Sequence, residues 1–187
     1  MTMSRDDVVT VAGLPGWRAL LVADADAGEP WGDALAPALL IGRGGRVRAA
    51  AEVYQPAHTG RLAHAWQYFC DHDLFCRYLR LCHGTTSIAT ASSQDTTALI
   101  FDTTAYRAHA GITGVADLSA EQAEWQAWLD GDVYGVVVQQ HIPAVSCTHC
   151  GQTTPAMWTA VESCWGYFGR ASAEDAAEPL LRACTAV

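Results

Sequence analysis

Two cysteines separated by two residues, Cys147 and Cys150, have the spacing best suited to metal binding in this sequence. Two thiolates three positions apart on a turn can both reach one Zn²⁺, and Gly151 eases the backbone bend that such a turn requires. A structural zinc site needs two further ligands. The candidates are a cysteine and a histidine on expected flanking strands, followed by two reserves: Cys164, His141, His149 and Cys184. The spacing predicts a structural zinc ion and no other cofactor, with two reduced loop cysteines as the alternative.

Other reactive side chains form weaker patterns. A redox role for the Cys147–Cys150 pair would need a strand-to-helix position, and a hairpin loop is the wrong place. His72 and Cys76, four apart on an expected helix, could form a Cys–His nucleophilic or metal site. Their neighbours are apolar, however, and a cysteine among apolar residues packs as a small hydrophobe. The enzymatic alternative is a metal-dependent hydrolase that uses some of the following residues: Cys147, Cys150, Cys164 and His72.

The composition excludes several reactions. The chain has 187 residues and contains no Lys and no Asn, so its 11 basic residues are all Arg. Catalysis through a Lys-bound pyridoxal cofactor is therefore excluded, as is a phosphate-binding loop with its Lys. A Gly-x-Ser-x-Gly elbow is absent, and Gly42-Arg-Gly44 lacks the third glycine of a dinucleotide fingerprint.

The charge is unevenly distributed along the chain, whose net charge is −9. Residues 1–94 hold 8 Arg and 9 acidic residues, whereas residues 95–187 hold 3 Arg and 11 acidic residues. Direct nucleic-acid binding is disfavoured because a basic surface is missing. The acidic half could bind the basic face of a protein partner, and an ordinary solvated surface is the alternative. The candidate partner-binding residues are Asp117, Glu121, Glu124, Asp130 and Asp132.

The cysteine count and the lack of long apolar stretches predict a soluble, cytoplasmic protein. Seven cysteines is an odd number, and the chain starts without an apolar signal core, so we expect reduced thiols. The longest apolar stretch, residues 34–41, contains Pro37 and is too short to cross a bilayer.

The alternation of apolar runs with turn residues predicts one α+β domain over residues 1–187, a mostly antiparallel sheet with helices packed on it. Residues 1–55 are rich in expected strands. The strands are predicted at 17–23, 38–42, 47–54, 86–91, 97–101, 133–142 and 157–168. Helices are predicted after caps at Thr59, Asp71 or Asp73, Asp102 to Thr104, Ser119 and Ser172.

Two tryptophans on the last predicted strand, Trp158 and Trp165, are seven positions apart. They point to opposite faces of the sheet unless a bulge intervenes, so one of them would be exposed at a contact surface.

Four blocks within residues 56–187 resemble one group of proteins. The blocks are Phe69–Gly84 (FCDHDLFCRYLRLCHG), Leu99–Arg107 (LIFDTTAYR), Trp128–Val138 (WLDGDVYGVVV) and Glu162–Gly169 (ESCWGYFG). They resemble uncharacterised proteins of actinobacteria, their plasmids and their phages. In that group a Gly-Asp-Val-Tyr/Trp-Gly strand precedes an Asp-Ser-Cys-Trp-Gly-Phe-Tyr-Gly strand. Here Glu162 replaces the Asp, and Tyr167 and Phe168 stand in reversed order. The resemblance implies an actinobacterial or actinophage context and carries over no activity.

These observations favour a non-enzymatic role. We expect a regulatory or counter-defence protein of a mobile element or its host, which binds a protein partner through its acidic half. The metal-dependent hydrolase is the main alternative, and a structural component of a particle is a third. The oligomeric state is not predicted.

Overall fold

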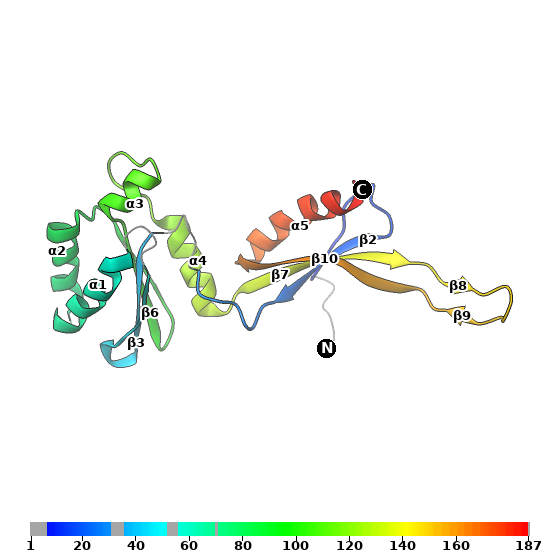
Figure 1. Ribbon diagram of the computed structural model, residues 1–187, viewed down its shortest axis with the longest axis horizontal. Helices are drawn as coiled ribbons and strands as arrows, with labels where there is room; N and C mark the ends of the chain where they lie inside the picture. The colour runs from blue at the N-terminus through cyan, green and yellow to red at the C-terminus, as the bar shows by residue number, and fades with distance from the viewer. Residues whose placement is uncertain (1–6, 31–35, 52–55, 70, 187) are drawn as a thin grey trace. The chain divides into compact units, whose positions relative to one another are not determined.

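The computed structural model of the protein describes residues 7–30, 36–51, 56–69 and 71–186 (Figure 1). It consists of helices and antiparallel sheets, so the predicted α+β fold class is confirmed. The chain divides into two compact units, residues 28–130 and a unit that joins residues 1–27 to residues 131–187. The sequence predicts one domain, and this division is not visible in it. None of the helices in the described ranges is long and apolar enough to span a membrane.

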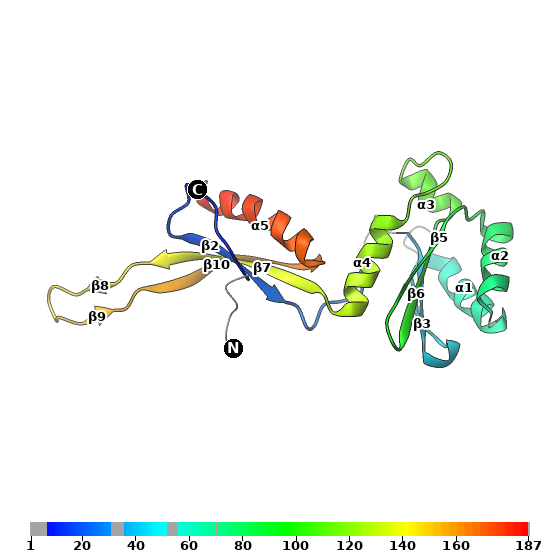
Figure 2. The ribbon, with the colours of Figure 1, turned by 180° about the vertical axis from the view of Figure 1, so that it is seen from behind.

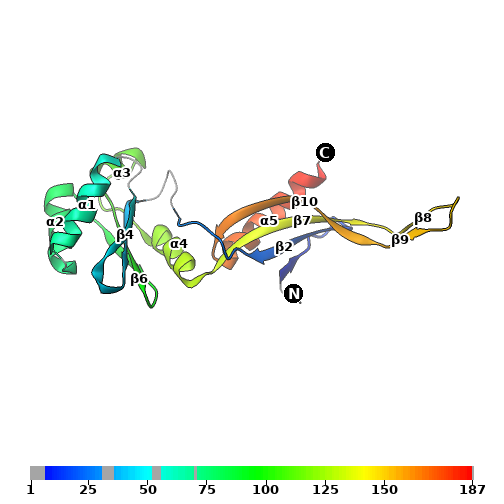
Figure 3. The ribbon, with the colours of Figure 1, turned by 60° about the horizontal axis from the view of Figure 1, so that its bottom comes forward.

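Residues 28–130 are built around an antiparallel sheet with the strand order β4-β3-β6-β5. Its strands are β3 (Ala38–Gly42), β4 (Val47–Ala51), β5 (Ile88–Ser92) and β6 (Thr96–Phe101). The helices of this unit are α1 (Pro56–Phe69), α2 (His72–His83), α3 (Thr104–His109) and α4 (Ser119–Asp130). Figures 1 and 3 show α1 and α2 on one side of the sheet and α4 on the other.

Side chains that alternate in direction along β6 contribute to both hydrophobic clusters of this unit. Leu99 and Phe101 pack with residues of α1 and α2, including the fully buried Phe75. Ala98 and Ile100 point the other way and pack with residues of α3 and α4, and Trp125 of α4 is fully buried there. Because successive side chains of a strand point to opposite faces, one short apolar strand can serve two helical layers. Both faces of this sheet are therefore covered.

The ends of α2 follow from its flanking residues. The carboxylate of Asp71 accepts the backbone N–H of Leu74 at 2.8 Å, and Gly84 ends the helix with φ +64°. Both features are the ones that the sequence predicts. Helix α1 begins at Pro56, earlier than the predicted cap at Thr59. Proline suits the first helical position because its missing N–H would have no partner there.

The carboxylate of Asp102 joins three segments of the same unit. Asp102 is fully buried at the end of β6, and its oxygens accept the backbone N–H groups of Thr86 and Ser87 at 2.7 Å. The Thr86 hydroxyl also donates to it at 2.7 Å, and the Arg107 guanidinium pairs with it. Arg107 in turn donates to the Gly84 carbonyl at 2.9 Å, which ties α3 to the end of α2. A buried carboxylate with this many donors is compatible with folding because its charge is fully compensated.

The second unit contains an antiparallel sheet with the order β1-β2-β7-β10 and one long helix. Its elements are β1 (Val8–Val9), β2 (Trp17–Ala23), β7 (Val133–Ile142), β10 (Met157–Phe168) and α5 (Arg170–Thr185). The strands predicted at 17–23, 133–142 and 157–168 have these bounds, and the predicted pairing of the last two is confirmed. A short ribbon of β8 (Val145–Ser146) and β9 (Thr153–Thr154) continues the β7–β10 hairpin beyond α5 (Figure 1).

Helix α5 covers one face of this sheet, as Figure 2 shows from behind. Ala173, Ala177 and Leu181 of the helix are fully buried against β2 and β7. The helix begins at Arg170 after Gly169, so the capping box predicted at Ser172 is wrong. Ser172 already lies inside the helix, and Arg170 forms an ion pair with Glu174 one turn later. Such a pair supports the first turn in the absence of a side-chain cap.

The Asp102 cluster predicts how stability depends on pH. Burial alone would raise the pKa of Asp102, but the hydrogen bonds from Ser87, Thr86 and Arg107 outweigh it and lower the pKa. A pKa lower in the folded than in the unfolded state adds stability that is present above the unfolded value of about 3.9 and is lost as the pH falls through the folded value. We expect Asp102→Asn to reduce the free energy of unfolding by about 3 kcal/mol at pH 7, and the difference from wild type to shrink below about pH 4.

Urea denaturation followed by circular dichroism between pH 3 and pH 7 measures this difference. Asp95→Asn is the matched control, because the Asp95–Arg43 ion pair is exposed and should contribute less than about 1 kcal/mol. Equal losses in the two variants would contradict the structural role of Asp102.

Candidate functional site

The register of β7 with its neighbours assigns each side chain of the second unit to a face of the sheet. Val136 and Val138 are fully buried in the cluster beneath α5, so even-numbered positions of β7 face the helix. Odd-numbered positions therefore face away from it. Each residue of β10 lies on the same face as the β7 residue that it pairs with: Cys164 is opposite Val136, and Trp158 is opposite His141. Cys164 thus lies on the helix face, and Trp158 lies on the other face.

We call the face opposite α5, over β2, β7 and β10, the open face. It carries Arg18, Gly135, Val137, His141, Trp158, Val161 and Trp165. The exposed fractions of Trp158, Val161 and Trp165 are 37%, 49% and 50%. A hollow of about 360 Å³ lies next to Trp165 and is lined by Val137, Ala160 and Val161 among others. Exposed large apolar side chains grouped on one surface are typical of binding sites.

Contacts within the open face hold its aromatic rings in place. The Arg18 guanidinium lies 4.1 Å from the centre of the Trp158 ring and donates to the Gln139 side chain at 2.9 Å. The His141 ring meets Trp158 edge-on at a centroid distance of 5.1 Å. These contacts orient the Trp158 ring before any partner binds, because a cation over an indole is attracted to its π face.

Trp165 is held by a different device. A Cβ atom added at Gly135 would lie 2.2 Å from the Trp165 ring, so the indole rests directly on the glycine backbone. The β10 register shifts between Cys164 and Tyr167, where Gly166 adopts φ +85°. A second shift lies between Ala160 and Glu162. The shift between Ala160 and Glu162 lies between the two tryptophans and brings them to the same face, which is the exception that the sequence analysis allows for.

The hairpin that carries the open face contains no Asp, Glu or Arg from Val133 to Val161. We call residues 133–161 the uncharged hairpin. From His141 to Ser163 every residue is exposed. An exposed segment of this length in a chain of net charge −9 would ordinarily carry charges. This gap between charged residues is a signal in the sequence that points to the open face, and the sequence predictions do not use it.

The CxxC pair lies at the tip of this hairpin. The backbone N–H of Cys147 donates to the Gln152 carbonyl at 2.8 Å, and the Gly151 N–H donates to the Cys147 carbonyl at 2.9 Å. Gly151 adopts φ +72°, as the predicted bend requires. The Cys147 sulfur accepts the backbone N–H of Cys150, contacts the Cys150 thiol and accepts the N–H of His149, and these hydrogen bonds lower the pKa of Cys147. The two thiols therefore lie side by side in an exposed turn.

The predicted zinc ligands His141 and Cys164 do not join this pair. They lie on opposite faces of the sheet. Cys164 pairs with Val136 of β7, which is five residues away from His141 along that strand. At about 3.3 Å per residue that is a separation of roughly 16 Å. Cys164 instead contacts Tyr167, whose pKa this hydrogen bond raises to about 12. Burial raises the pKa of Cys184, the reserve ligand on α5, and Glu162 adds to the effect. The described ranges contain no cluster of three or more His, Cys, Asp or Glu side chains able to hold a metal ion.

The five predicted partner-binding carboxylates differ in exposure: Asp117 and Asp130 are exposed, Glu124 and Asp132 are half-buried, and Glu121 is buried. Glu121 is only 7% exposed and accepts a short hydrogen bond from the Tyr106 hydroxyl. Burial raises the pKa of Glu124, and the neighbouring Glu121 raises it further. Asp117 is exposed, but its pKa is lowered by the Ser119 N–H that it accepts. Asp130 accepts a hydrogen bond from Gln126, and Asp132 follows two residues later in the chain.

Arginines also neutralise several other carboxylates of the acidic half. The ion pairs are Arg43–Asp95, Arg107–Asp102, Arg170–Glu174 and Arg182–Glu178. The last two are i,i+4 pairs on α5. Arg107, Arg170 and Arg182 belong to the acidic half and are already included in its charge, so Arg43 is the one arginine of these pairs that comes from residues 1–94.

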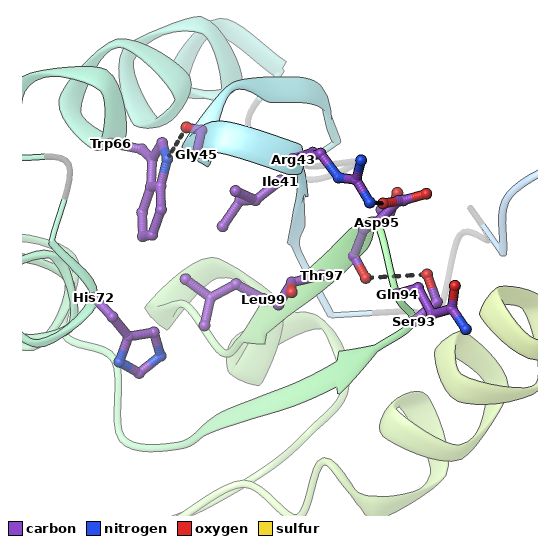
Figure 4. Close-up of a pocket in the computed structure, with 12 residues that line it drawn as sticks. Ile41, Arg43, Gly45, Trp66, His72, Ser93, Gln94, Asp95, Thr97 and Leu99 are labelled. Atoms are coloured by element: carbon purple, nitrogen blue, oxygen red, sulfur yellow. Dashed lines mark hydrogen bonds and ion pairs between the residues drawn. The ribbon is translucent and has the colours of Figure 1, made fainter.

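The pair His72 and Cys76 lacks the environment of a nucleophile. The Cys76 sulfur lies 3.8 Å from the His72 ring nitrogens, and burial raises the pKa of Cys76. A buried thiol of raised pKa stays protonated near neutral pH and is a poor nucleophile. Figure 4 shows His72 beside a pocket that is also lined by Trp66 and by the Arg43–Asp95 ion pair. The volume of this pocket is about 350 Å³. Trp66 donates to the Gly45 carbonyl at 2.8 Å, so this pocket offers an apolar wall and no activated acid or base pair.

No protein-family model matches the chain, and neither a curated protein nor a solved structure is significantly similar to it. The resemblance to actinobacterial proteins therefore stays a prediction. The quoted blocks do have structural roles here. Phe69–Gly84 includes α2 with both its caps, Leu99–Arg107 holds the Asp102 cluster, and the last two blocks supply Gly135 and Trp165, which pack on each other.

The Gly135–Trp165 contact leads to a direct test. We expect Gly135→Ala to displace the indole and to lower the free energy of unfolding by about 1–3 kcal/mol, because the new methyl group overlaps the ring. The Trp165 indole N–H signal in an NMR spectrum, assigned with Trp165→Phe, should shift. Gly28→Ala is the control, since a Cβ there meets nothing within 4 Å. If Gly135→Ala lowers the free energy of unfolding by the same amount in a Trp165→Ala background, the contact with Trp165 does not explain why residue 135 is a glycine.

Proposed function

We propose that the protein is a non-enzymatic binding protein whose open face docks onto a protein partner. The observation that carries the proposal is the exposure of two held tryptophans, Trp158 within the uncharged hairpin and Trp165 just beyond its end. Trp and Arg are the residues most enriched among those that dominate binding energy at protein interfaces. Arg18 stacked on Trp158 supplies both types at one place.

The chemistry of the surface indicates the kind of partner. Residues 133–161 offer no carboxylate or guanidinium, and Arg18 and Glu162 are charged residues at this surface, so the partner should present mainly apolar and neutral polar groups. Nucleic acid is disfavoured, because affinity for phosphates depends on several cationic side chains and the open face has Arg18 as its arginine. The hollow next to Trp165 could receive one apolar side chain of the partner.

The cellular setting belongs to the same proposal. The six described cysteines are unpaired thiols, which agrees with a reducing cytoplasm. The motif blocks support an actinobacterial or actinophage origin, where a binding protein without catalytic groups would act as a regulatory or counter-defence factor. A metal-dependent hydrolase is less well supported, because Cys147 and Cys150 lie at an exposed tip and catalytic metals are held in clefts.

The proposal predicts a salt-resistant interaction. We expect the tagged protein to capture a specific protein from an actinobacterial lysate, and to retain it at 0.5 M NaCl because apolar contacts are not screened by salt. The double variant Trp158→Ser/Trp165→Ser should lower the affinity for the purified partner at least about tenfold, as measured by calorimetry.

Two control variants make this experiment decisive. Tyr68→Ser/Leu81→Ser removes two large exposed side chains of the other unit and should leave binding unchanged. Asp117→Asn/Asp130→Asn tests the acidic surface and should also have no effect. Loss of binding in the acidic variant, or release of the partner by 0.5 M NaCl, would favour the acidic surface and overturn the proposal.

A further inference from the structure

We propose that Cys147 and Cys150 form one half of a zinc site that a second copy of this chain completes. In the resulting dimer, one Zn²⁺ would be held by four thiolates, two from each hairpin tip. This inference is independent of the proposed partner on the open face.

The turn is already shaped for two-thiolate binding. Residues 147–152 are closed by the hydrogen bonds from Cys147 to Gln152 and from Gly151 to Cys147, above the β8–β9 ribbon. The Ser146 and Thr153 hydroxyls, 3.0 Å apart, brace the base of the turn. Backbone N–H groups of His149 and Cys150 point at the Cys147 sulfur. Such N–H donors compensate the negative charge that collects on sulfur in a zinc thiolate site.

The chain itself supplies only half of a closed site. A structural zinc ion takes four ligands in a tetrahedron. No third His, Cys, Asp or Glu groups with the two thiols within the part of the chain that the structure describes. His141 and Cys164, the expected partners, lie on opposite faces of the sheet below the tip. In the proposed site the other two ligands come from a second copy of the chain, which provides two identical thiolates related by a two-fold axis.

The charge and exposure of the tip permit this approach. All residues from His141 to Ser163 are exposed, so the thiols are accessible from outside. Two chains of net charge −9 repel each other at most orientations, but residues 133–161 carry no Asp, Glu or Arg. The tips are thus where two copies can meet with little electrostatic cost. A tip-to-tip contact buries little area by itself, so the metal would supply most of the association energy.

The experiment measures mass and metal content together. The untagged full-length protein is prepared in reducing buffer, and zinc is titrated while light scattering after gel filtration reports the mass. We expect the 20.0 kDa monomer to double in mass at one zinc per two chains, and EDTA to reverse the change. Cobalt in place of zinc should give the spectrum of tetrahedral four-thiolate coordination.

Matched variants separate this site from the alternatives. Cys147→Ser and Cys150→Ser should each abolish the zinc-dependent dimer, whereas Cys82→Ser, which changes an exposed cysteine on α2, should not. His149→Ala should leave the dimer intact. One zinc per monomer, loss of metal in His149→Ala, or a dimer that persists with EDTA would each overturn the inference, as would a complete lack of zinc binding. Trp158→Ser/Trp165→Ser should retain the zinc dimer, which keeps this test separate from that of the open face.

Discussion

The alternation of side chains along β7 governs the second unit. β7 is paired on both sides, by β2 and by β10, so its register assigns all three strands to common faces. The helix face carries Val136 and Val138, and the other face carries Gly135 and His141. A shift of one residue would place the valines outside and the polar residues beneath α5, which makes any other register costly. The position of the tryptophans follows from this single constraint.

The two units differ in how many faces of their sheet are covered by helices. The β4-β3-β6-β5 sheet has helices on both faces, and its central strands are continuously apolar from Ala38 to Ile41 in β3 and from Ala98 to Phe101 in β6. The β1-β2-β7-β10 sheet has α5 on one face, and in β7 the valines Val136 and Val138 are fully buried on that face while Gln139 and His141 lie on the other. A sheet with one covered face ordinarily exposes polar side chains on the other. Here that face exposes indole rings, so solvation does not account for its composition.

Local patterns in the sequence were enough to predict much of the fold. The bounds of β2, β3, β7 and β10 and both caps of α2 follow from apolar runs and turn residues. The start of α5 does not, because Gly169 at φ +83° leads the chain from β10 directly into the helix at Arg170, so Ser172 lies inside it. The CxxC turn is visible in the sequence, but its other ligands depend on the separation along the hairpin. The acidic surface stays a prediction, but the sequence does not show that Glu121, one of its five residues, is buried and accepts a hydrogen bond from the Tyr106 hydroxyl.

The edge of β10 explains why the open face, rather than the strand edge, is suited to docking. A long exposed edge strand invites unspecific pairing with other chains. In β10 the two register shifts, at Ala160–Glu162 and Cys164–Tyr167, interrupt the regular spacing of hydrogen-bonding groups along that edge. Bulges of this kind twist an edge away from further strands. The shift at Ala160–Glu162 also brings Trp158 and Trp165 to one face, so this irregularity of the backbone both limits edge pairing and assembles the aromatic surface.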